Sequence, residues 1–271
     1  MMKILIIAIG IIAVLILLYL FFFLRATRRG VPDELRCSYA HRGLHGNGIP
    51  ENSMPAFRAA AEADFGIELD IQLSKDGQVM VFHDASLLRM TGCGKKLSEL
   101  SLTELKALHL ADTEARIPTL AEVLELVDGR VPLLVEFKGT AVDTGLCEKA
   151  AELLSNYNGP YCVESFNPML LKKLRKLLPE ARRGQLYSNF CREKKEKGKL
   201  PSPVEVLLSV LFFNLFAKPD FISLNRLDRG NLTLRIFFFF CPVPRFSWTC
   251  VGEKETEEAK RCGECPIFEL K

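Results

Sequence analysis

The stretch FGIELDIQLSKDGQVMVFHD, residues 65–84, contains two strand-like segments joined by a turn. In Phe65–Leu73, polar side chains alternate with aliphatic ones, which is the period-two pattern of a β-strand. Val79–Phe82 is apolar throughout, and the Asp76-Gly77 pair before it is a strong hairpin signal. The stretch therefore predicts a strand over 65–73 with a short antiparallel arm over 79–82.

Strand-like and helix-like segments alternate over the rest of the chain. Besides the arm, the expected strands are Cys37–Ala40, Phe65–Leu73, Val131–Phe137, Tyr161–Phe166, Arg183–Tyr187, Phe221–Leu224, Phe246–Cys250 and Pro266–Leu270. Alternating strands and helices predict a parallel sheet, and eight such units fit a closed (β/α)₈ TIM barrel. A doubly wound open sheet is the alternative, but no G-x-G-x-x-G motif follows the first strand.

The segments between these strands are mostly helix-like. Thr119–Val127, for example, begins with a capping box formed by Thr119 and Glu122. The two segments between the Arg183–Tyr187 and Phe221–Leu224 strands have other compositions. Arg192–Lys199 is predicted to be a solvated, mostly basic loop, and Pro203–Ala217 an apolar helix too short to cross a bilayer comfortably.

The N-terminus has a different composition, because Ile4–Leu24 contains no charged residue. A helix of that length reaches about 31 Å, the thickness of the hydrocarbon core of a bilayer. A cleaved signal peptide is the alternative, but it would need a shorter apolar run and a small-residue cleavage site. Arg25, Arg28 and Arg29 follow the span, so the positive-inside rule predicts an uncleaved single-pass anchor with a cytoplasmic main domain. The expected division is a transmembrane anchor (1–24), a juxtamembrane tether (25–36) and the barrel (37–271).

Charge and cysteine content limit the function classes. The formal net charge is +3 and the basic residues are scattered, so nucleic-acid binding is not expected. The nine cysteines are odd in number and irregularly spaced, which argues against a disulfide framework. Cys262 and Cys265 form a single C-x-x-C motif, and without a second pair it is a poor zinc site.

The residues that end the expected strands are the candidate site residues, because barrel active sites lie at the carboxyl ends of the strands. Side chains two positions apart on a strand point the same way, about 6.6 Å apart. The segments that carry these charges are apolar, and an unpaired charge buried there is costly. The candidates are His41 and Arg42 after the first strand, Glu68 and Asp70 on the second, His83 at the end of the arm, and Glu136 and Lys138 at the end of the third.

These residue types fit one kind of chemistry. Three converging carboxylates repel each other unless a cation lies among them, and Mg²⁺ or Ca²⁺ suits an all-oxygen set better than zinc. Arg42 and Lys138 add a site for an anion with several oxygens, most naturally a phosphate. Two histidines then allow proton removal on one side and proton donation on the other. Together these groups are what phosphodiester cleavage requires.

Three sets of motifs resemble those of the glycerophosphodiester phosphodiesterase family: AHRG followed by PENS, then ELDIQLSKDGQVMVFHD, then VEFK. The resemblance implies a TIM barrel with a small insertion after the second strand, within Asp76–Arg116. It also implies a divalent-metal-dependent hydrolase that splits glycerophosphodiesters into glycerol 3-phosphate and an alcohol. By motif match, the acid–base pair is His41 and His83, the metal ligands are Glu68, Asp70 and Glu136, and the phosphate contacts are Arg42 and Lys138. Trp248 resembles the family's tryptophan near the glycerol or alcohol part of the substrate.

Two other functions stay open at this point. A lysophospholipase D would perform the same chemistry on lysophospholipids, and the N-terminal anchor and the apolar Pro203–Ala217 segment favour access to lipid. A non-catalytic, membrane-anchored binding module belongs to a different class, and the intact set of charged residues argues against it. The sequence does not distinguish Mg²⁺ from Ca²⁺, nor water from a substrate hydroxyl as the first attacking group. The Phe237–Phe240 run departs from the ordinary amphipathic helix expected there.

Overall fold

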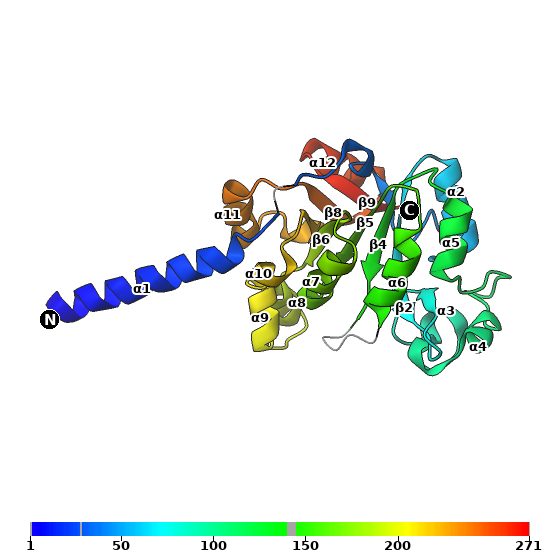
Figure 1. The fold of residues 1–271 in the computed structure, drawn as a ribbon, viewed down its shortest axis with the longest axis horizontal. Helices are drawn as coiled ribbons and strands as arrows, with labels where there is room; N and C mark the ends of the chain where they lie inside the picture. Colours follow the sequence, from blue (N-terminus) through cyan, green and yellow to red (C-terminus); the bar gives the residue numbers. More distant parts are fainter. Residues whose placement is uncertain (1, 28, 140–144, 271) are drawn as a thin grey trace.

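A closed barrel of parallel strands forms the centre of the structure (Figure 1). The computed structural model describes residues 2–27, 29–139 and 145–270. The barrel strands are β1 (Tyr39–Ala40), β2 (Gly66–Leu73), β4 (Leu133–Phe137), β5 (Tyr161–Ser165), β6 (Arg182–Tyr187), β7 (Phe221–Asn225), β8 (Arg245–Val251) and β9 (Cys265–Glu269). The barrel closes at β1, where Tyr39 pairs with Gly66 on one side and with Ile267 on the other. The predicted TIM barrel is therefore confirmed.

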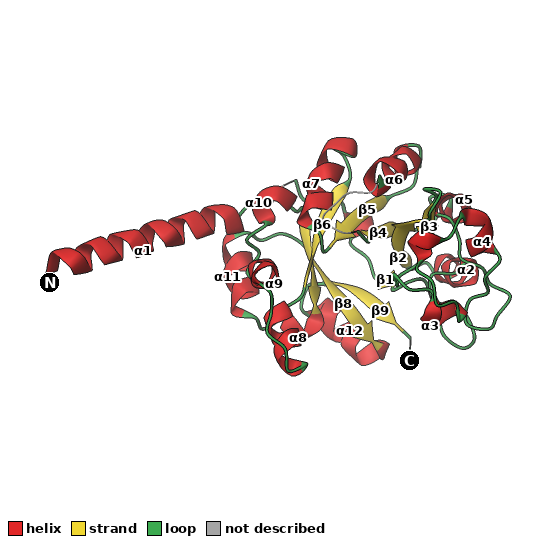
Figure 2. Ribbon diagram, turned by 90° about the horizontal axis from the view of Figure 1, so that it is seen from below, coloured by secondary structure: helices red, strands yellow, loops and turns green. Residues whose placement is uncertain are grey.

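Helices surround the strands on the outside, as Figure 2 shows. They are α2 (Met54–Glu62), α5 (Leu120–Val127), α6 (Leu146–Ser155), α7 (Pro168–Leu177), α8 (Phe190–Glu196), α9 (Pro203–Ser209), α10 (Asn214–Ala217), α11 (Leu232–Phe240) and α12 (Gly252–Arg261). Helix α5 begins with the predicted capping box, because Thr119 accepts a hydrogen bond from the Glu122 amide. Helices α2, α5, α6 and α7 bury apolar side chains in the core around the strands.

An insertion follows β2 and carries its own small core. Strand β3 (Val79–Val81) pairs antiparallel with the end of β2, as the Asp76-Gly77 turn predicted. Beyond it lie α3 (Leu88–Thr91), a 3₁₀ turn at Leu97–Glu99 and α4 (Leu102–Lys106). Their apolar side chains pack with those of the arm, including Met80, Phe82, Leu87, Leu97, Leu105 and Ile117. This core fixes the end of β3 against the carboxyl end of β2.

Two sequence expectations between β6 and β7 were wrong. The predicted loop at Arg192–Lys199 is largely helix α8, because Asn189 caps its first turn and Arg192 pairs with both Glu196 and Asp228. The single helix predicted over Pro203–Ala217 is broken into α9 and α10. Leu211 between them has a φ of 54°, a left-handed conformation that ends an α-helix.

Helix α1 (Met2–Phe23) projects from one side of the barrel, and nearly all of its length is exposed (Figure 1). It is long and apolar enough to cross a membrane. Its last turn packs on the barrel, where the Phe23 and Phe237 rings lie 5.4 Å apart and the Tyr19 hydroxyl donates to the Val210 carbonyl. Beyond the helix, Arg29 forms an ion pair of 2.9 Å with buried Asp220. The end of α1 is therefore held against α11 and against the segment that follows α9.

Candidate active site

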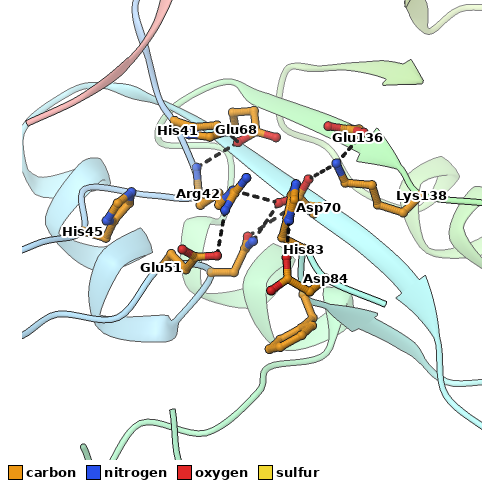
Figure 3. Close-up of polar contacts among 12 residues, drawn as sticks. His41, Arg42, His45, Glu51, Glu68, Asp70, His83, Asp84, Glu136 and Lys138 are labelled. Carbon is orange, nitrogen blue, oxygen red and sulfur yellow. Dashed lines mark hydrogen bonds and ion pairs between the residues drawn. The ribbon is translucent and has the colours of Figure 1, made fainter. Parts of the chain in front are cut away.

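His41 follows β1 and is oriented by an acid from the last strand. Its Nδ1 lies 2.6 Å from Oε1 of Glu269. Its Nε2 lies 3.9 Å from Oε2 of Glu68, and Figure 3 shows these two side chains beside each other. The hydrogen bond with His41, helped by the nearby His45 ring, lowers the pKa of Glu269 well below its ordinary value. An ionised Glu269 accepts the Nδ1 proton, so Nε2 of His41 faces the carboxylate cluster. Sequence reasoning missed Glu269.

Arg42 occupies a strained turn that bends the chain away from the barrel mouth. Its φ is 55°, and Gly43 after it also has a positive φ, of 78°. A Cβ on Gly43 would lie 2.8 Å from the carbonyl carbon of Ala56, so only glycine fits there. The Arg42 amide donates to Oε2 of Glu68 at 2.8 Å. The guanidinium donates to Oε1 of Glu51, also at 2.8 Å.

Glu51 and Asn52 hold this turn in place. Glu51 lies between two arginines and accepts hydrogen bonds from Arg42 and Arg89. Burial alone would raise the pKa of Glu51, but these two guanidinium groups lower it overall. Asn52 is buried and donates to Oδ2 of Asp70 at 2.8 Å. Glu51 and Asn52 of the PENS segment therefore hold the Arg42 guanidinium and the Asp70 carboxylate in position.

Glu68, Asp70 and Glu136 form a buried carboxylate cluster, with one oxygen from each within 4.8 Å of the others. Strand register brings two of them together, because Asp70 pairs with Glu136 across β2 and β4. Lys138 contacts this cluster, and its Nζ lies 3.0 Å from Asp70 and 2.7 Å from Glu136 (Figure 3).

Burial and mutual repulsion shift the protonation of these acids. Burial, reinforced by the charges of Asp70 and Glu136, raises the pKa of Glu68 well above its ordinary value. Burial also raises the pKa of Glu136 to about 7. Burial alone would raise the pKa of Asp70, but Lys138 and His83 hold it below its ordinary value. The site therefore has more acids than its own cations can keep ionised.

Glu164 on β5 is a fourth buried acid that sequence reasoning missed. It pairs with Glu136 in strand register, and burial raises its pKa well above the ordinary value. Its Oε2 has no hydrogen-bond partner among the described residues. An acid inside the apolar YCVESF segment was the available signal.

The donor set fits a hard divalent cation. Every candidate ligand atom is a carboxylate oxygen, which Mg²⁺ and Ca²⁺ prefer. The orphaned oxygen of Glu164 and the raised pKa of Glu68 both indicate a surplus of negative charge that such a cation would offset.

His83 is oriented in the same way as His41. Its Nδ1 lies 2.6 Å from Oδ1 of Asp84, and Asp84 is held in turn by Arg89. Burial lowers the pKa of the His83 ring, and the charge of Lys138 acts in the same direction. The neutral ring therefore predominates at pH 7, with Nε2 as its acceptor atom.

The predicted residues line one cavity of about 110 Å³. Of the predicted set, only Asp70 is missing from its walls, because it is buried beneath them. Trp248 forms part of the wall and donates from Nε1 to the Ser223 carbonyl at 3.0 Å. The lining includes His41, Arg42, Glu68, His83, Glu136, Lys138, Glu164, Phe166 and Trp248.

A larger, mostly apolar cavity of about 510 Å³ lies beside the first one. The two cavities share Glu136, Lys138 and Phe166 as wall residues. The apolar side of the larger cavity is formed by side chains from α7, α9 and the segment after α9, namely Met169, Val204, Leu208 and Phe213.

Curated proteins are similar in sequence to part of this chain. The glycerophosphodiester phosphodiesterase of Caldanaerobacter subterraneus subsp. tengcongensis is 38% identical over 160 residues, which cover 55% of this chain and 65% of that protein. The lysophospholipase D GDPD1 of Rattus norvegicus is 34% identical over 131 residues, which cover 44% of this chain and 40% of that protein. The chain thus spans less than two thirds of the length of these curated relatives.

Solved structures share the fold. A phosphodiesterase of Oleispira antarctica, in complex with the product sn-glycerol-3-phosphate, has a TM-score of 0.68 and 22% identity, with 88% of this chain and 94% of that chain covered. A glycerophosphodiester phosphodiesterase of Thermotoga maritima has a TM-score of 0.63 and 26% identity, with 86% and 94% covered. A family model described as glycerophosphoryl diester phosphodiesterase matches residues 41–207, which include nearly all of the site. The chain belongs to the glycerophosphoryl diester phosphodiesterase family.

Proposed function

We propose that this protein is a divalent-metal-dependent hydrolase that cleaves glycerophosphodiesters to glycerol 3-phosphate and an alcohol. One observation carries the proposal: a buried carboxylate cluster and two carboxylate-oriented histidines meet in one cavity with Arg42 and Lys138. Family membership and the relatives named above support the same reaction.

Glu68, Asp70 and Glu136 are the proposed ligands of one Mg²⁺ or Ca²⁺ ion. When bound, such an ion supplies positive charge that stabilises the charge developing on the phosphate oxygens. Arg42 and Lys138 bind the nonbridging oxygens from the same cavity. Trp248 and Phe166 form an apolar wall against the glycerol or alcohol part of the substrate.

His41 and His83 are the proposed acid–base pair. Each donates Nδ1–H to a carboxylate, so each presents Nε2 for proton transfer. One ring removes the proton from the attacking oxygen, and the other protonates the departing alcohol oxygen. Over the whole reaction one water is consumed, and one P–O bond breaks as another forms. The lowered pKa of His83 suits it to accept a proton at neutral pH.

The N-terminal segment is the proposed membrane attachment. Residues 1–24 form a single-pass anchor, 25–36 a juxtamembrane tether and 37–271 the catalytic barrel on the cytoplasmic side. The exposed apolar surface of α1 and the arginines after it support this assignment.

A lysophospholipid is the second candidate substrate, and the apolar cavity is the observation that favours it. The cavity adjoins the site through Glu136 and Lys138, and its volume of about 510 Å³ is that of a small-molecule pocket. An acyl chain on the glycerol would lie against Val204, Leu208 and Phe213 while the phosphate stays between Arg42 and Lys138.

The test is product analysis with the full chain in detergent, stripped with EDTA and then supplied with Mg²⁺ or Ca²⁺. Metal-restored release of glycerol 3-phosphate from glycerophosphocholine is the expected result. Turnover of lysophosphatidylcholine alone would replace the main substrate class with the second. Metal binding without turnover of either substrate would overturn both and favour a binding module.

A further inference from the structure

Helix α11 exposes a continuous apolar stripe. Leu232, Ile236, Phe239 and Phe240 follow the spacing of one helix face, and their side chains are 69%, 38%, 80% and 50% exposed. The opposite face, with Leu234 and Phe237, is buried against the barrel. The catalytic proposal uses none of these residues. A contiguous exposed apolar patch marks an interaction site more often than a solvated surface, so this stripe indicates a partner.

The stripe lies directly beside the point where α1 leaves the barrel. Besides the Phe23–Phe237 contact, the Cys241 thiol at the end of α11 lies 3.4 Å from the Leu24 carbonyl. Figures 1 and 2 both show α11 on the side of the barrel from which α1 projects. The end of α1 and helix α11 are therefore neighbours, and a bilayer crossed by α1 would lie on the side of the barrel that carries α11.

Basic residues surround a hollow beside this stripe. A cavity of about 310 Å³ is lined by Phe238, Phe239, Arg229, Arg235, Arg245, Leu224 and Glu264. Arg229 is already paired with Glu264 and Glu258. Within the described part of the chain, neither Arg235 nor Arg245 forms an ion pair, and the Arg245 guanidinium lies 4.2 Å from the centre of the Phe238 ring. Two guanidinium groups that form no ion pair with a described residue thus line the same cavity as Phe239, the most exposed phenylalanine of the helix.

We propose that α11 is a second membrane contact, which lies in the bilayer surface beside α1 and binds anionic phospholipid headgroups through Arg235 and Arg245. Its apolar stripe enters the boundary between headgroups and acyl chains, as in interfacial helices. Each arginine near an anionic surface favours docking by about fivefold, or ~1 kcal/mol. This contact rests on the proposed anchoring of α1 and fixes the barrel with one side on the membrane.

The test reads the depth of α11 in vesicles that contain the full chain. Phe239→Trp and the matched control Leu88→Trp, which is 59% exposed on the insertion, are each compared with the parent, whose only tryptophan is Trp248. The vesicles contain phosphatidylcholine with or without phosphatidylglycerol, and acyl-chain-brominated lipid is the quencher. We expect several-fold stronger quenching for Phe239→Trp than for Leu88→Trp, and a further increase with phosphatidylglycerol.

Three results would overturn parts of this picture separately. A chain that fails to float with vesicles after a high-salt wash would remove the anchor and the docking together, but not the catalytic proposal. A chain that floats but shows equal quenching for the two variants would overturn the docking alone. If the double variant Arg235→Gln/Arg245→Gln still shows the increase in quenching with phosphatidylglycerol, the proposed headgroup binding is wrong. The exposed control Arg58→Gln should keep that increase.

Discussion

The barrel segment from β1 to β4 and the segment from β6 to β8 differ in what their side chains contact. In the first, charged and titratable side chains at strand ends are fixed by contacts with carboxylates, as Arg42 is by Glu51 and His83 is by Asp84. In the second, long apolar side chains line the larger cavity and the outer face of α11. Reacting groups must be fixed to within a fraction of an ångström, whereas contacts with lipid need only apolar area. Under the proposed function, chemistry and substrate access are divided between the two segments.

The largest effect is expected from removing an acid–base group in the first segment. His83→Ala should lower kcat for glycerophosphocholine by about 10² or more, because proton transfer to or from the reacting oxygen is lost. Metal affinity, measured by calorimetry, should stay within experimental error. The control is His109→Ala, an exposed histidine outside the catalytic cavity whose Nδ1 lies 2.7 Å from the Thr113 carbonyl oxygen. Full activity of His83→Ala would contradict the acid–base role of His83 and the assignment of catalysis to the β1–β4 segment.

Glu269 departs from this division, because it lies on the last strand, outside both segments, and yet orients His41. Glu269→Gln should lower kcat by roughly 10-fold to 100-fold, since the amide does not hold the Nδ1 tautomer of His41 as the carboxylate does. KM should change little, because Glu269 does not line the catalytic cavity. Glu269→Asp should recover part of the loss. A rise in KM with normal kcat would indicate that Glu269 only supports the loop around His45.

The sequence could predict three of the four buried acids of the site but not Glu269, the group that orients His41. Glu68, Asp70 and Glu136 stand in apolar strands, where the period-two pattern fixes the face of each side chain. Glu269 lies 228 residues from His41, and the two meet only because the barrel closes between β1 and β9. The break at Leu211 depends on a single left-handed residue in an apolar run, which hydrophobic periodicity does not record.

A smaller effect is expected in the second segment, and it should be selective. Leu208→Asp places a charge on the wall of the larger cavity and should raise KM for lysophosphatidylcholine by about tenfold, as the acyl chain loses an apolar contact. KM for glycerophosphocholine should not change. Val206→Asp is the matched control, because Val206 lies on the same helix but outside the cavity wall. Equal losses on both substrates would show that the cavity does not bind an acyl chain.

The smallest effect is expected on the stability of the metal-free chain, in which no bound cation offsets the charge of the buried carboxylates. The folded-state pKa of Glu136 is about 7, above its ordinary value of 4.5, so the folded chain binds more protons than the unfolded chain between these values. Stability in EDTA should therefore fall as the pH rises through this window, with a loss of a few degrees in Tm. Glu136→Gln should flatten that decline, whereas the exposed control Glu125→Gln should keep it.

Added Mg²⁺ or Ca²⁺ should also abolish the decline in the parent, because a bound cation favours the ionised carboxylates. A decline that persists in Glu136→Gln would mean that other groups, such as Glu68 and Glu164, carry the proton uptake.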